Sequence, residues 1–80
     1  MQTNIWKPYA QFVAFDYARM AHEADACRDS LQARLKERKA RGPSGLGGVR
    51  VWEWENRTLY AMYLEQRSLA KELHSRAARL

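Results

Sequence analysis

Cysteine is almost absent from this sequence, because Cys27 is the only one in 80 residues. A lone thiol excludes an intramolecular disulfide framework, and Cys27 falls within an apolar helical stripe, so we expect a small buried side chain rather than a reactive thiol. No apolar segment typical of a signal peptide is visible, since Lys7 and Asp16 interrupt the N-terminal apolar stretch. No uncharged apolar run approaches the roughly 20 residues of a membrane-spanning helix. We therefore expect a cytoplasmic protein without a membrane partner.

Glycine and proline are scarce, and most of them are concentrated in one place. All four glycines and one of the two prolines lie in the segment Gly42-Pro43-Ser44-Gly45-Leu46-Gly47-Gly48. Such a composition cannot sustain a helix or a strand. The sequence therefore predicts a turn at 42–48, with a regular element on each side.

The first of these elements has the pattern of a long helix. Pro8 suits the first turn of a helix, and Gly42 followed by Pro43 is a strong stop signal after a cationic last turn. We expect a helix over about 8–41, preceded by an extended arm at 1–6. Its apolar and small residues recur in steps of three or four, which predicts one continuous buried stripe: Tyr9, Val13, Tyr17, Met20, Ala24, Cys27, Leu31 and Leu35.

The segment after the turn is consistent with two structures. Residues 49–55 are β-branched and aromatic, so they could be a short extended piece before Asn56 caps a helix. A helix over about 50–78 is favoured, because one helical face collects apolar residues: Trp52, Leu59, Met62, Tyr63, Leu69, Ala70, Leu73, Ala77 and Leu80. The predicted fold is all-α, an antiparallel helical hairpin forming a single domain over 1–80.

The sequence contains more apolar surface than one hairpin can cover. Hydrophobic residues make up 46% of the chain, and nine residues are aromatic. Two antiparallel helices leave one side of each apolar stripe in water, and pairing two hairpins into a four-helix bundle would bury it. We expect a homodimer, or a hairpin completed by a different protein partner.

No catalytic or metal-binding constellation is recognisable. His22-Glu23 begins like a zinc-protease motif, but position 26 is alanine where a second histidine is required. His22, Asp25 and Asp29 have helical spacing and could in principle hold a divalent metal, although a solvated polar face explains them better. The turn glycines lack the lysine and hydroxyl residue of a phosphate-binding loop. We expect a protein that is not an enzyme and needs no cofactor or metal.

The net charge of +5 is concentrated around the turn. Residues 28–50 contain seven lysines and arginines against two carboxylates, which accounts for all of the excess. An antiparallel hairpin gathers this charge at one end, as a basic collar of Arg34, Arg38, Lys39, Arg41 and Arg50. The collar could neutralise phosphates of a nucleic acid, meet an acidic protein surface, or only keep the helix ends solvated.

Aromatic residues next to this charge suggest a contact surface. Trp52 and Trp54 are two residues apart, so they cannot both face the core of one helix, and at least one should be exposed near Arg50. An exposed tryptophan could stack on a base or anchor a protein contact. Phe15 flanks the stripe of the first helix and is a further candidate. Tryptophan and arginine are common energetic anchors of protein complexes, which favours protein binding.

The sequence thus supports two hypotheses of function. The first is a small non-enzymatic interaction protein that binds and modulates a protein partner or assembly through Trp52, Trp54, Phe15 and Arg50. Chains of this kind are often accessory factors of phages or mobile elements. The alternative is a sequence-nonspecific DNA- or RNA-binding protein that uses the basic collar.

Overall fold

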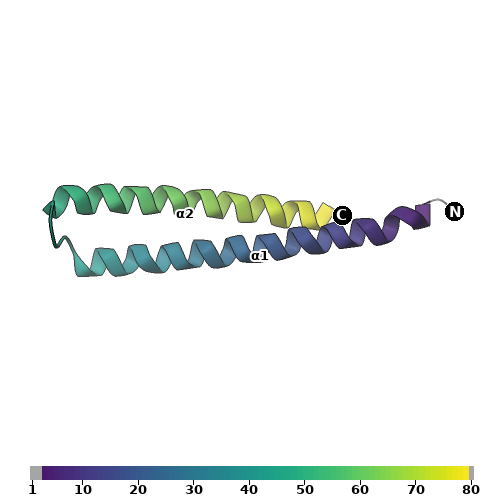
Figure 1. The fold of residues 1–80 in the computed structure, drawn as a ribbon, viewed down its shortest axis with the longest axis horizontal. Helices are drawn as coiled ribbons and strands as arrows, with labels where there is room; N and C mark the ends of the chain where they lie inside the picture. Colours follow the sequence, from purple (N-terminus) through teal and green to yellow (C-terminus); the bar gives the residue numbers. More distant parts are fainter. Residues whose placement is uncertain (1–2, 80) are drawn as a thin grey trace.

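Two long helices packed side by side form an antiparallel hairpin (Figure 1). The computed structural model describes residues 3–79, with side chains from Val13 onward. Helix α1 spans Thr3–Arg41 and helix α2 spans Gly48–Arg79, and no strand occurs over this range. The molecule measures 67 × 15 × 15 Å, and the N-terminal part of α1 projects beyond the end of α2 (Figure 1). The predicted all-α hairpin is confirmed.

The helix ends differ from the predicted ones mainly at the N-terminus. Helix α1 begins at Thr3, so the expected extended arm is wrong for residues 3–6, while residues 1–2 lie outside the described part. Pro8 removes only one backbone hydrogen bond, and the first-turn amides before it need no helical partner, which lets the helix start upstream. Residues 49–55 belong to α2, which excludes the extended alternative.

The turn needs glycine for conformation and for space. Gly42 ends α1 with a φ of +77°, and its N–H donates to the carbonyl of Arg38 at 3.0 Å. Gly47 has a φ of +89°, and a Cβ atom there would overlap the side chain of Val51. A side chain at position 47 would therefore strain the turn and clash with α2.

The contact between the helices follows the heptad pattern of a coiled coil. Steps of four and three residues separate the side chains along the seam, and all of them are buried or half-buried. In α1 the seam consists of Tyr17, Ala21, Ala24, Arg28, Leu31, Leu35 and Arg38. In α2 it consists of Trp52, Asn56, Leu59, Tyr63, Gln66, Ala70, Leu73 and Ala77.

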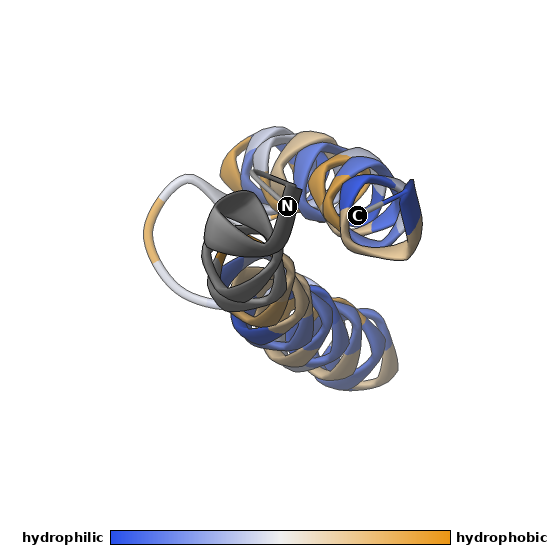
Figure 2. Cartoon of the chain, turned by 90° about the vertical axis from the view of Figure 1, so that its right-hand side faces the viewer, coloured by the Kyte–Doolittle hydropathy of each residue, from blue (hydrophilic) through white to orange (hydrophobic). Residues whose placement is uncertain are grey.

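The core along this seam is thin. A cluster of Ala21, Ala24, Ala70 and Leu73 packs under Tyr17 in the half of the hairpin away from the turn, and Leu31 and Leu35 are buried closer to it. Hydrophobic and hydrophilic segments alternate around both helices in the view along the hairpin (Figure 2). Because each buried side chain stabilises the fold in proportion to its apolar area, three alanines and three leucines contribute little for a chain of this length.

Four residues predicted in the buried stripes are exposed instead. Met20, Met62 and Leu69 keep 45%, 46% and 44% of their surface, and Cys27 is exposed as well, which corrects the expectation of a buried thiol. Steps of three or four residues can be drawn through either of two adjacent lines of side chains on a helix, one with Met20 and one with Ala21. Only the line that includes Ala21 faces the partner helix. The predicted contacts of Tyr9 and Leu80 lie outside the described side chains.

Candidate functional site

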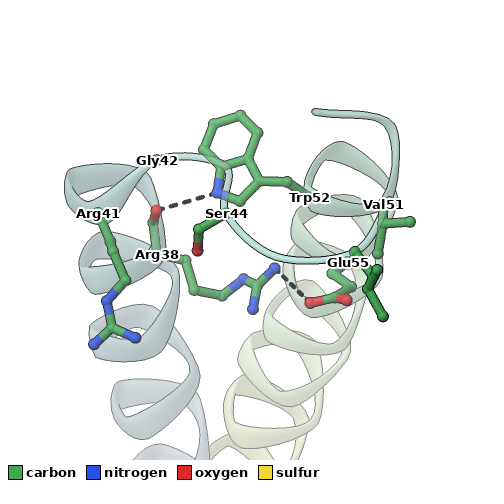
Figure 3. Close-up of a pocket in the computed structure, with 8 residues that line it drawn as sticks. Arg38, Arg41, Gly42, Ser44, Val51, Trp52 and Glu55 are labelled. Carbon is green, nitrogen blue, oxygen red and sulfur yellow. Dashed lines mark hydrogen bonds and ion pairs between the residues drawn. The ribbon is translucent and has the colours of Figure 1, made fainter. Parts of the chain in front are cut away.

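Arg38 and Trp52 tie the end of α1 to the beginning of α2 (Figure 3). Arg38 Nε donates to Asn56 Oδ1 at 2.9 Å, and its Nη2 forms an ion pair with Glu55. The indole Nε1 of Trp52 donates to the Arg38 carbonyl at 3.2 Å. Both predicted contact residues are thus engaged inside the hairpin, where they fix the register of the helices at the turn.

Trp54 points away from the partner helix and is 62% exposed, which confirms that at least one of the two tryptophans is exposed. Arg50 lies four residues before it and Arg57 three residues after it, so all three share the outer face of α2. Neither arginine belongs to an ion pair among the described side chains. We call Arg50, Val51, Trp54 and Arg57 the turn-end face; its helical spacing could have identified Arg57 from the sequence.

The predicted basic collar is not one continuous surface. Arg38 is paired with Glu55, and Arg41 with Glu37 at 2.6 Å. By heptad position, Arg34 and Lys39 flank the seam on opposite sides. A role of these residues in nucleic-acid binding stays a prediction.

Phe15 is 70% exposed but far from the other predicted contact residues. It lies 26 residues before the end of α1, which corresponds to about 40 Å along the helix at 1.5 Å per residue. A small partner that covers Trp54 could not reach Phe15 at the same time.

The seam residues occupy positions a and d of the heptad, and positions e and g flank the seam on either side. These two flanks give the hairpin two long sides of different chemistry. On one flank, four g positions form an exposed stretch that we call the apolar side, with Met20 and Cys27 on α1 and Met62 and Leu69 on α2. Other g positions are charged: Arg34, Arg41, Glu55 and Arg76. The e positions form what we call the polar side, with Asp25, Gln32 and Lys39 on α1 and Tyr60, Arg67 and His74 on α2.

The polar side contains a small charged network. His74 Nε2 and Asp25 Oδ2 are hydrogen-bonded at 2.7 Å, and Arg28 forms an ion pair with Asp25 at 2.9 Å. The hydrogen bond from His74, together with the charge of Arg28, lowers the pKa of Asp25 below its ordinary value. Asp29 accepts from Arg28 at 3.0 Å and raises the pKa of that guanidinium.

The suggested metal ligands do not come together in this region. Asp25 pairs with His74 from α2, whereas His22 is exposed and makes no hydrogen bond or ion pair within the described side chains. Over the part of the chain that the structure describes, no three His, Cys, Asp or Glu side chains gather as a metal site would require.

Comparison of the chain with protein-family models, curated proteins and solved structures finds no match. Neither described helix has the length and apolar character needed to cross a membrane. Function is therefore inferred from the surfaces of the hairpin.

Proposed function

We propose that this chain is a non-enzymatic interaction protein that binds and modulates a protein partner through the turn-end face. The observation that carries the proposal is Trp54, a large aromatic side chain that is 62% exposed between two arginines with no ion pair among the described side chains. Tryptophan and arginine are the residues most enriched among the energetic anchors of protein interfaces.

The setting of Trp54 suits an anchor. Arg38 and Trp52 hold the backbone of this part of α2 against α1, so the outer face is presented by a fixed element. Little conformational freedom would be lost when a partner covers it, which favours affinity. Val51 adds apolar surface one helical turn before Trp54.

The charge of this face defines the chemistry of the partner. Arg50 and Arg57 carry no compensating carboxylate among the described ion pairs, so the complementary surface is acidic with an apolar pocket for the indole. Electrostatic complementarity of this kind speeds association and selects against basic partners.

The same hairpin self-associates in this proposal, with two copies joined along their apolar sides into a four-helix bundle. In the single hairpin the thin seam leaves Met20, Met62 and Leu69 exposed to water. The four-helix bundle would bury these surfaces. An antiparallel arrangement of the two copies is favoured, because a parallel one would place the two cationic turns together.

The test is affinity capture from cells in which the protein is naturally made, with quantitative mass spectrometry. Trp54→Ala should weaken capture of the specific partner by about 30-fold or more, the loss expected for a central anchor. Phe15→Ala is the matched control, because it removes a similarly exposed aromatic residue about 40 Å away.

Equal capture by the wild type and Trp54→Ala would overturn the proposal. An equal loss in Trp54→Ala and Phe15→Ala would also overturn it, because binding would then reflect exposed aromatic surface in general. Circular dichroism should show unchanged helicity in both variants.

A further inference from the structure

The polar side holds an open groove between the helices that combines cations with an aromatic platform. We call it the tyrosine groove. Its polar and aromatic lining comes from Asp29, Gln32, Lys36 and Lys39 of α1 and from Tyr60, Tyr63 and Arg67 of α2. It lies across the hairpin from the apolar side, so self-association through that side leaves the groove accessible.

Two tyrosines form the platform. The rings of Tyr60 and Tyr63 are stacked with their centroids 6.0 Å apart and their planes inclined by 26°. Tyr63 is half-buried in the seam and supports Tyr60, which is 52% exposed. A flat ring held in place and open to solvent can accept another planar ring on its exposed surface.

Three cations surround this platform. Lys36, Lys39 and Arg67 take part in no ion pair among the described side chains. The one carboxylate of the lining, Asp29, is already paired with Arg28 at 3.0 Å. The groove therefore presents nearly uncompensated positive charge, which attracts an anionic ligand.

We propose that the tyrosine groove binds single-stranded nucleic acid, with a base stacked on Tyr60 and phosphates held by Lys36, Lys39 and Arg67. A positively charged groove with an aromatic ring is the combination that single-strand binders use, because phosphates and base faces alternate along the ligand. Bases within a duplex are stacked on each other and offer Tyr60 no free face. The site differs from the basic collar, with which it shares only Lys39.

The probe is a fluorescently labelled oligothymidylate of about 16 nucleotides, the upper site size of small single-strand-binding folds. Fluorescence anisotropy at several salt concentrations should show binding that weakens with salt. Tyr60→Ala should weaken binding by about 5- to 100-fold, as expected for loss of one stacked base, whereas Tyr60→Phe should bind like the wild type.

The charge contribution is measured separately. Lys36→Gln combined with Lys39→Gln should reduce the slope of log K against log salt by about 1.4, since each phosphate contact to a single strand contributes about 0.7. Arg34→Gln combined with Arg50→Gln removes the same charge outside the groove and should leave the slope nearly unchanged.

Three outcomes would overturn the proposal. One is equal affinity of Tyr60→Ala and the wild type, and another is equal affinity for the single strand and for a duplex of the same length. The third is binding of a polyglutamate peptide with no binding of the oligonucleotide at low salt, which would identify an acidic protein ligand. Capture of a protein partner through Trp54 is independent of all three.

Discussion

The two long sides of the hairpin differ in chemistry although they flank the same seam. The apolar side exposes Met20, Met62 and Leu69, which gain from leaving water. The polar side exposes Tyr60 among cations, which stay hydrated and attract charge. The heptad repeat places an apolar stretch on one flank and cations around an aromatic pair on the other, which gives a thin molecule two non-overlapping surfaces. We expect one to serve self-association and the other to bind a ligand.

The largest expected effect comes from placing charge on the apolar side. Met62→Glu combined with Leu69→Glu should abolish self-association, because four carboxylates would have to be buried in each dimer. Sedimentation equilibrium at micromolar concentrations should then show one chain where the wild type shows two.

The matched variant places charge on the polar side. Tyr60→Glu combined with Arg67→Glu should leave the dimer intact and eliminate binding of the oligonucleotide. A wild-type monomer with a cooperative melt would contradict the self-association, and a dimer lost in both variants would contradict the division into two sides.

A smaller effect is expected at the turn, on which both sides depend. Arg38→Met removes the hydrogen bond to Asn56 and the ion pair with Glu55. It should lower the free energy of unfolding by about 1–3 kcal/mol. Each kcal/mol lost should lower the melting temperature by roughly 4–8 °C. Arg41→Met, which removes only an exposed pair within α1, is the control. Equal melting temperatures of the two variants would show that Arg38 does not hold the register.

The smallest effect concerns the pH dependence of the polar side. Because the folded-state pKa of Asp25 is lowered from its ordinary value of 3.8, its contribution to stability is present above that pH and is lost as the pH falls through the lower, folded value. Thermal melts of Asp25→Asn should therefore lose less stability on acidification than those of the wild type. Asp16→Asn controls for loss of one carboxylate on α1; an identical acid response of Asp25→Asn and the wild type would contradict the prediction.

The sequence predicted the architecture well because its strongest signals are local. The glycines around Gly42 stop one helix, and the apolar face containing Ala70 and Leu73 defines the other. Which line of side chains enters the seam could not be predicted from neighbouring residues alone. Met20 and Ala21 fit the same steps of three or four, and only pairing with α2 decides that the smaller residue enters the seam.

The contact surfaces were predictable in part. The exposure of one tryptophan followed from the spacing of Trp52 and Trp54, but the hydrogen bond that selects Trp52 for the seam joins residues 14 positions apart in the sequence. The tyrosine groove combines Lys36 and Arg67 from different helices, so it depends on the register of the hairpin, which the sequence did not specify.

We also expect the position of the Arg38 contacts to influence the order in which the hairpin assembles. They join residues only 14 and 18 positions apart, whereas the bond between Asp25 and His74 spans 49. Closing a short loop costs less chain entropy than closing a long one, so we expect helix pairing to start at the turn and proceed toward the termini. We therefore expect the turn to act as the folding nucleus and the alanine cluster at the far end to form last.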